Sequence, residues 1–169
     1  MALACRMLPI ADGSDLGGSL RNPASFCNVL GLRPSPGRVP VWPSTMGWSS
    51  LSVYGPMARS VSDLAYFLAA IAGPDPRSST FVDEPGSRFA GPLDRDFKGV
   101  RVAWWKDLGG LPVDPRVREV VDSQWQVFES LGCIVEETEP DFSGAVEIFQ
   151  VLRSWQVYLA ITGLPLGGT

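Results

Sequence analysis

The sequence of 169 residues contains no histidine, and this absence excludes several common kinds of active site. Hydrolases with a Ser-His-Asp or Cys-His arrangement need an imidazole, and so do zinc centres with histidine ligands. Lysine is scarce as well, because only Lys98 and Lys106 occur among the 14 basic residues. A reaction that uses lysine as its general base therefore has two candidates in this chain.

Clusters of positive charge and paired cysteine motifs are also missing. The formal net charge is −4 and no run of Lys or Arg occurs, so we expect no nucleic-acid partner. Cys5, Cys27 and Cys133 are odd in number and have no CxxC spacing, which is typical of free thiols in a reducing compartment. The cysteines therefore predict a cytoplasmic location, and we expect no bound metal.

Long apolar segments are absent, although 45% of the residues are hydrophobic and a buried core is expected. The longest apolar stretch, residues 64–73, has about ten residues, whereas a membrane-spanning helix needs roughly 20. Residues 1–11 are apolar, but they lack a basic beginning and are interrupted by Arg6, which argues against a signal peptide. We therefore expect a globular protein with no membrane partner.

The composition changes near residue 60. Residues 13–56 are rich in glycine, proline and serine, which predicts an ordered loop system with short strands, and residues 7–11 before them predict a buried strand. From Ser60 onward the pattern becomes helical, because Ser60 and Asp63 form a capping-box signature. The apolar face of this predicted helix consists of Val61, Leu64, Ala65, Leu68 and Ile71.

A predicted strand-helix-strand unit follows. Residues 100–105 alternate and contain β-branched and aromatic side chains, which predicts a strand. Asp114 as the N-cap, with proline at the first helical position, predicts one helix that ends at Gly132, and residues 134–137 predict a second strand. Because the two strands flank one helix, we expect them to be parallel with a right-handed crossover. A last helix is expected over residues 144–161, so the fold class is α/β.

The most informative segment is the loop GSDLGGSLR over residues 13–21. Its two adjacent glycines can take positive φ, so that backbone N–H groups turn toward one point and bind negative charge. With Ser19 beside such a nest, the loop would form an oxyanion hole next to a nucleophile. The alternative is a tight turn that an ion pair between Asp15 and Arg21 stabilises. The residue types alone favour the plain turn.

Residues 13–40 closely resemble the signature of the amidase signature family. The family pattern is G-S/T-D-x-G-G-S-I/L-R-x-P-A/S, followed by F-C-G-x-x-G-L/F-K/R-P-S/T-x-G-R-V/L, and this chain reads GSDLGGSLRNPASFCNVLGLRPSPGRVP. Residues 55–63, GPMARSVSD, are similar to the family's G-P-L/M/I-A/T-R-S/T-V-x-D. Residues 107–115 look like the family pattern D-L-G-G-L-P-V-D-P. The resemblance therefore covers most of the chain.

The resemblance implies part of the amidase signature fold, an α/β architecture in which a mixed, mostly parallel sheet has helices packed around it. It implies a single partial amidase domain over residues 1–169 that is incomplete at both ends. Residues 1–60 would form the glycine- and serine-rich catalytic loop region, and residues 61–169 would form the helices and the βαβ unit.

The resemblance also implies a reaction, the hydrolysis of an amide carbon-nitrogen bond through a serine acyl-enzyme. Ser19 matches the nucleophile of the family's Ser-Ser-Lys triad, and Ser14 matches a position that supports the serine network. The backbone N–H groups that match the oxyanion hole belong to Leu16, Gly17, Gly18 and Ser19. Asp15 and Arg21 match a structural ion pair. The implied substrate is a small amide, no cofactor is needed, and the formation of a homodimer stays open.

Two members of that triad have no counterpart in this sequence. In the family the lysine and the bridging serine precede the nucleophile, the serine within a Gly-Gly-Ser-Ser-Gly-Gly loop, but residues 1–18 contain neither the lysine nor this loop. Lys98 and Lys106 lie downstream and match no catalytic position, so we expect Lys98 to be solvated and Lys106 to be a charge at a strand end. We therefore expect an internal fragment of an amidase with little or no turnover by itself.

Two other functions stay open at this point. One is a non-catalytic remnant that binds a partner. The other is an A-type subunit of glutamyl-tRNA amidotransferase, which shares the signature. Residues 43–54 lack the Ser-Leu-Asp-Gln run expected for that protein, so the sequence ranks it below an amidase hydrolase.

Four further side chains have both a structural and a functional interpretation. Trp42 and Trp48 fall where the family shapes its acyl pocket, but core packing is the expected role of both rings. Asp107 is expected to stabilise a turn or a helix cap, and Cys27 is expected to be a packed thiol.

Overall fold

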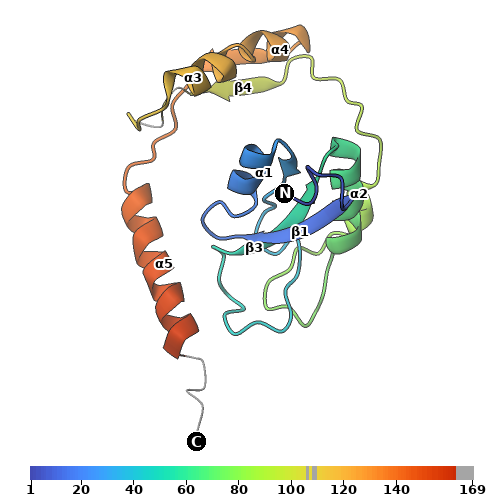
Figure 1. Ribbon diagram of the computed structural model, residues 1–169, viewed down its shortest axis with the longest axis vertical. Helices are drawn as coiled ribbons and strands as arrows, with labels where there is room; N and C mark the ends of the chain where they lie inside the picture. The colour runs from blue at the N-terminus through green and yellow to red at the C-terminus, as the bar shows by residue number, and fades with distance from the viewer. Residues whose placement is uncertain (106, 108–109, 163–169) are drawn as a thin grey trace, which may run out of the picture. The chain divides into compact units, whose positions relative to one another are not determined.

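The computed structural model describes residues 1–105, 107 and 110–162 (Figure 1). The backbone contacts divide the chain into two units, of which one comprises residues 1–93 with the segment from Leu152 onward, and the other comprises residues 94–151. Each unit carries its own sheet. Among the described helices, none is long and apolar enough to cross a membrane. The single partial amidase domain expected from the sequence stays a prediction.

The first sheet leads directly into the predicted catalytic loop. Its strands are β1 (Ile10–Asp15), β2 (Leu30–Gly31) and β3 (Val53–Ala58), in the order β1-β3-β2. Both pairs of neighbouring strands are antiparallel. Asp15 opposite Val53 forms the last pair between β1 and β3, so the loop begins where the ladder ends.

The strand predicted over residues 7–11 begins three residues later than expected. Met7 lies outside the strand and is exposed. The physical cause is Arg59, whose Nη1 donates hydrogen bonds to the backbone oxygens of Leu3 at 2.9 Å and Leu8 at 2.7 Å. The guanidinium group occupies the Leu8 carbonyl, which the predicted strand would pair, while backbone hydrogen bonds hold residues 1–7 as turns.

Leu20 is the largest fully buried side chain of the described residues, and it directly follows Ser19. Gly13 and Gly55 face each other across β1 and β3, and a Cβ atom at either position would lie 3.0 Å from a methyl carbon of Leu20. A Cβ atom at Gly31 would lie 2.7 Å from the Leu20 backbone oxygen. These glycines leave the space that Leu20 fills, and the packing anchors the residue next to the loop serine.

The helix predicted from Ser60 is present as α2 (Val61–Ile71), which contacts β3. The Ser60 hydroxyl accepts a hydrogen bond from the Asp63 N–H at 3.1 Å, so the cap is the one that the sequence predicts. A short 3₁₀ helix, η1 (Gly86–Phe89), packs against α2.

A second helix of this unit, α1 (Arg21–Cys27), lies inside the region predicted as loops and contacts β2. Its proline, Pro23, is tolerated because it stands in the first turn, where the missing N–H has no helical partner in any case. The helix ends at Asn28, which takes the left-handed conformation with φ of 51°. The glycine and proline content of residues 13–56 therefore predicted loops at a place where the structure has a helix.

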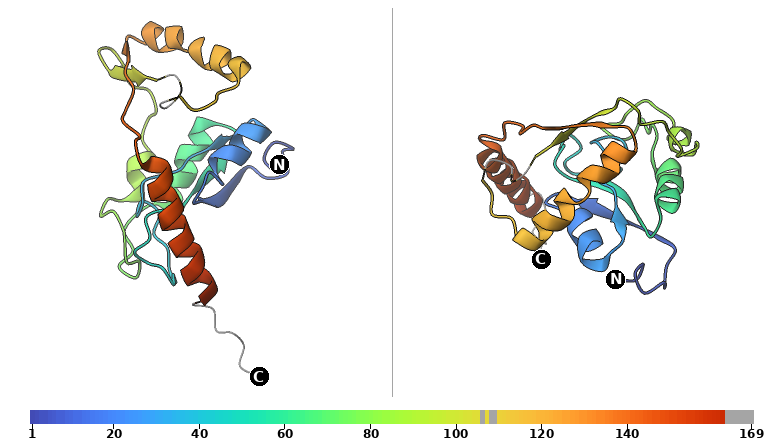
Figure 2. Two further views of the ribbon diagram at one scale, coloured as in Figure 1. Left: turned by 90° about the vertical axis from the view of Figure 1, so that its left-hand side faces the viewer. Right: turned by 90° about the horizontal axis from the view of Figure 1, so that it is seen from above.

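The second unit contains the predicted parallel pair, β4 (Arg101–Trp104) and β5 (Ile134–Glu137). Helices α3 (Pro115–Asp122) and α4 (Trp125–Ser130) lie along one side of β4 (Figure 2). The Trp104 ring packs edge-on against Trp125 and Phe128 of α4, with ring centroids 5.6 and 5.9 Å away. Aromatic packing therefore fixes α4 on the strand.

The single helix predicted between Asp114 and Gly132 is interrupted at Ser123 and Gln124. The Ser123 hydroxyl donates to the Val120 backbone oxygen at 2.7 Å, and the Gln124 side-chain amide donates to the same oxygen at 3.3 Å. These side chains compete with backbone N–H groups for a helical carbonyl, which is the physical reason for the break.

The observed fold is α/β, as predicted from the sequence. The last helix, α5 (Ala145–Thr162), lies within one residue of its predicted range. Parallel pairing is confined, within the described strands, to β4 and β5, whereas the first sheet is antiparallel. The expectation of mostly parallel strands therefore holds for the βαβ unit alone.

Candidate active site

Ser19 lies in the turn between β1 and α1, and its side chain is exposed. Within the described part of the chain, no hydrogen bond involves its hydroxyl group, which leaves the oxygen accessible. Ser14 is also exposed and lies opposite Tyr54 on β1. The structure shows no hydrogen bond between Ser14 and Ser19, so a supporting role of Ser14 stays a prediction.

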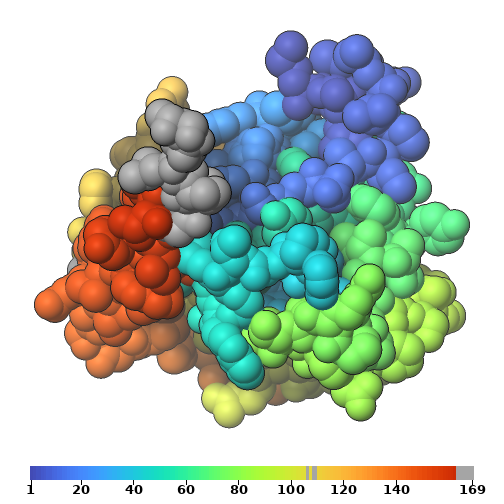
Figure 3. Space-filling view, turned by 90° about the horizontal axis from the view of Figure 1, so that it is seen from below, coloured from blue at the N-terminus to red at the C-terminus, as the bar shows by residue number. Residues whose placement is uncertain are grey.

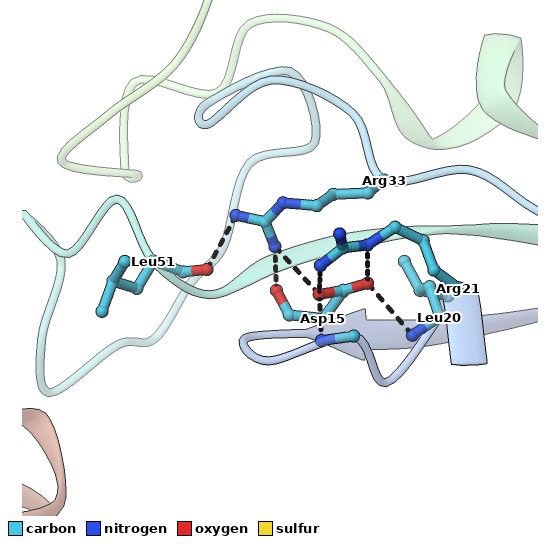
Figure 4. Close-up of polar contacts among 6 residues, drawn as sticks. Asp15, Leu20, Arg21, Arg33 and Leu51 are labelled. Carbon is cyan, nitrogen blue, oxygen red and sulfur yellow. Dashed lines mark hydrogen bonds and ion pairs between the residues drawn. The ribbon is translucent and has the colours of Figure 1, made fainter. Parts of the chain in front are cut away.

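The Asp15 carboxylate is completely buried and accepts hydrogen bonds from the backbone of this turn (Figure 4). Its Oδ1 accepts the Gly18 N–H at 2.8 Å, and its Oδ2 accepts the Leu20 N–H at 3.3 Å. Arg21 donates to both oxygens, from Nε at 2.9 Å and from Nη2 at 3.0 Å. The predicted ion pair is therefore present and is bidentate.

These contacts determine the charge state of the cluster. The hydrogen bonds from Arg21 hold the pKa of the Asp15 carboxyl well below its ordinary value, and the N–H groups of Gly18 and Leu20 act in the same direction against the effect of burial. The hydrogen bond to Asp15 likewise raises the pKa of Arg21. The turn is thus held by a permanently ionised pair near neutral pH.

A third charged residue, Arg33, completes the cluster and was missed by the sequence analysis. Its Nη1 donates to the Asp15 backbone oxygen and, at 3.2 Å, to Oδ1, while its Nη2 donates to the Leu51 backbone oxygen at 2.9 Å. The side chain of Arg33 is 25% exposed, compared with 55% for Arg21. Arg33 connects the loop to the chain segment that precedes β3.

The two glycines before Ser19 have different roles. Gly18 has φ of +110°, and a Cβ atom there would lie 2.7 Å from the side chain of Asn22, so this position needs glycine. Gly17 is not among the residues with positive φ. The Gly18 N–H already donates to Asp15. Of the four predicted oxyanion donors, those of Leu16, Gly17 and Ser19 have no partner within the described residues.

A cavity of about 400 Å³ lies beside this loop. Leu16 is one of its lining residues, whereas Ser19 is not. Figure 3 shows the hollow between the segment around residues 40–50, in cyan, and the segment around residue 80, in light green. The predicted catalytic loop therefore borders a space of the size that small ligands occupy.

The two tryptophans of this region are not core residues, contrary to the expectation. Trp42 is 52% exposed and lines a second, more open recess, and the Arg77 guanidinium lies 5.9 Å from its ring centroid. Trp48 is 83% exposed. Both tryptophans belong to residues 39–52, which form no helix or strand, and core packing does not reach their rings because they lie on this surface loop segment.

The remaining predictions concern single side chains. Asp107 accepts the Gly110 N–H at 2.8 Å, which confirms its turn role. Lys98 is exposed as expected, whereas Lys106 lies outside the described residues. Cys27 is an unpaired, half-buried thiol.

Comparisons with known proteins agree with the sequence pattern. A family model described as Amidase matches residues 1–156. The chain is 40% identical over 152 residues to the A subunit of the glutamyl-tRNA(Gln) amidotransferase of Pseudomonas syringae pv. syringae (strain B728a). That match covers 89% of this chain and 32% of the relative, so the chain spans about a third of the length of the curated relatives it matches.

Solved structures match the fold. The A subunit of the glutamyl-tRNA(Gln) amidotransferase from Thermotoga maritima has a TM-score of 0.79 at 26% identity, over 98% of this chain and 36% of that one. A bacterial aryl acylamidase of the amidase signature enzymes has a TM-score of 0.74 at 29% identity, over 82% and 28% of the two chains. Since the family model covers nearly the whole chain and these folds agree, the chain belongs to the amidase signature family.

Proposed function

We propose that this chain carries the nucleophile loop of an enzyme that cleaves amide bonds through a serine acyl-enzyme. The observation that carries the proposal is the exposed Ser19 hydroxyl, in a turn whose Leu16, Gly17 and Ser19 N–H groups are unpaired within the described residues. A buried, ionised Asp15 fixes the backbone of this turn. Fixed N–H donors beside a nucleophile stabilise the negative oxygen that forms when an amide carbonyl is attacked.

The proposed reaction has two steps. First, Ser19 Oγ forms a bond to the carbonyl carbon, the carbon-nitrogen bond breaks, and the amine leaves with a proton. Water then attacks the resulting ester and releases the acid together with free Ser19. The serine proton needs an acceptor, and the family resemblance assigns this task to a bridging serine and a lysine that precede the loop.

Lys98 and Lys106 are the only lysines among these 169 residues, and neither matches that catalytic position. We therefore propose that the 169-residue chain alone turns over amides slowly or not at all. DNA upstream of the codon for Met1 offers an inexpensive check, since an in-frame Gly-Ser loop and lysine there would supply the missing groups. A stop codon or frameshift would favour the non-catalytic remnant instead.

A second candidate is the A-type component of a glutamyl-tRNA amidotransferase. The sequence alone ranks it below a hydrolase, but the observation in its favour is the 40% identity to such a protein. Both candidates share the cleavage of an amide, so the assignment of Ser19 is the same in both. Release of ammonia from glutamine, compared with hydrolysis of an anilide, separates them. Under the hydrolase proposal, the substrate is a small amide, the location is cytoplasmic and no nucleic acid binds.

The test of the proposal is a Ser19→Ala substitution in the full gene product that carries these residues. We expect the rate of 4-nitroanilide hydrolysis, or of ammonia release from glutamine, to fall by at least about 10³-fold, because loss of a catalytic serine removes the acyl-enzyme route. Circular dichroism checks that the variant folds. An undiminished rate would show that Ser19 is not the nucleophile.

The 169-residue chain is assayed in parallel. Robust hydrolysis that depends on Ser19 would contradict the requirement for a lysine and a bridging serine that precede the loop. It would leave the nucleophile assignment intact.

A further inference from the structure

The cavity beside the loop is lined by uncharged residues. None of its lining residues within the described chain is Asp, Glu, Lys or Arg. Serine and threonine are frequent, namely Ser44, Thr45, Ser49, Ser52, Ser78 and Thr80. At about 400 Å³, the cavity has the volume of a typical small-molecule site. Its lining suits a ligand group that is polar and neutral.

One lining residue, Gln156, has a polar atom without a partner. Gln156 belongs to the part of α5 that falls in the first unit, and only 4% of its surface is exposed. Its Nε2 donates a hydrogen bond to Ser49 Oγ. Its Oε1 is buried and has no hydrogen-bond partner within the described residues. A buried carbonyl oxygen of this kind is rarely left unpaired, since water no longer solvates it.

We propose that Gln156 Oε1 accepts a hydrogen bond from a neutral N–H group of the substrate, and that the cavity therefore selects a carboxamide. A carboxylate would bring a second acceptor against Oε1. An alkylammonium group would lose its hydration without an opposing charge in the lining. A neutral amide N–H donates to Oε1 and brings neither an opposing acceptor nor an unpaired buried charge.

This inference rests on the proposed function, because Leu16 of the nucleophile loop lines the same cavity. A group bound at Gln156 therefore occupies a space that the loop borders. Gln156 acts here as a residue that sets specificity, and the Ser49 hydroxyl holds its amide in place.

The test measures binding and not turnover, so it does not depend on the outcome for Ser19. The full gene product that carries these residues, with the change Ser19→Ala, is titrated by calorimetry near pH 7 with benzamide, benzoate and benzylamine, which are similar in size and differ in charge. We expect benzamide to bind at least about tenfold more tightly than either ion. Equal binding of the three probes, or tighter binding of benzoate, would overturn the inference.

Substitution of the glutamine then locates the contact. Gln156→Leu should weaken benzamide binding about tenfold, the effect of one lost hydrogen bond. Gln150→Leu is the matched control, because Gln150 is an exposed glutamine on the same helix, and it should leave binding unchanged. Unchanged binding in the Gln156 variant, or an equal loss in the control, would contradict the assignment.

A second variant keeps the test informative if Gln156→Leu fails to fold. Gln156→Glu places a carboxylate at the same point and should reverse the preference, so that benzylamine binds more tightly than benzamide. A misfolded chain cannot gain affinity for benzylamine. A Gln156→Glu chain that keeps the original preference would show that this side chain does not contact the ligand.

Discussion

Asp15 determines the geometry of the candidate active site more than any other residue. Its two oxygens accept hydrogen bonds from two backbone N–H groups and from two arginines. The pair with Arg21 could be predicted because the partners are six residues apart in one loop. Arg33 is 18 residues away, and its contact depends on how β2 pairs with β3, for which the sequence has no local signal.

The acid sensitivity of the fold should depend on Asp15. Because its pKa is lowered in the folded state, its contribution to stability is complete above the ordinary value of 3.8 and is lost as the pH falls below that value. Asp15→Asn should lower the free energy of unfolding at pH 7 by about 3 kcal/mol, since two arginines lose a buried partner. At pH 3 this difference should be about 1 kcal/mol smaller.

Urea unfolding of both chains at the two pH values measures the effect. Asp12→Asn, an exposed aspartate on the same strand, is the control for the change in net charge and should shift stability by less than about 0.5 kcal/mol at pH 7. A difference between wild type and Asp15→Asn that stays constant from pH 7 to pH 3 would refute the role of the ionised carboxylate.

At the scale of elements, the positions of most helices and strands could be predicted from the sequence, whereas the contacts between strands could not. Apolar spacing and a cap predicted α2, a last helix was expected where α5 lies, alternation predicted β4, and β5 was expected as the second strand of a strand-helix-strand unit. The sequence could not show that Gly13 and Gly55 face each other, because that depends on the register between β1 and β3. Without this register, the burial of Leu20 has no visible cause.

The packing around Leu20 makes Gly55 the most constrained of these glycines. A Cβ atom there would lie 2.2 Å from the Leu32 backbone oxygen and 3.0 Å from Leu20 Cδ1, so the backbone must shift. Gly55→Ala should destabilise the chain by about 3 kcal/mol. Gly91→Ala, where no atom lies within 4 Å, should change stability by less than about 0.5 kcal/mol. Thermal unfolding compares them, and equal midpoints would contradict the packing argument.

At the scale of the whole molecule, the division into two units predicts where a protease cuts first. Residues 91–98 join the units, form no helix or strand and are mostly exposed. Limited trypsin digestion should cleave first after Arg95 or Lys98, since both side chains are exposed. Mass spectrometry identifies the fragments, and the double change Arg95→Gln, Lys98→Gln should slow the first cut. Initial cleavage at Arg59 or Arg101 would contradict this division.

The arginine pair around Asp15 also gives the loop an electrostatic potential of its own. The Asp15 carboxylate and the guanidinium groups of Arg21 and Arg33 together carry a net charge of one positive unit, in a chain whose overall charge is −4. The local field therefore has the opposite sign to that of the protein as a whole. Under the proposed reaction, this field favours the negative charge that develops on a carbonyl oxygen when Ser19 attacks it.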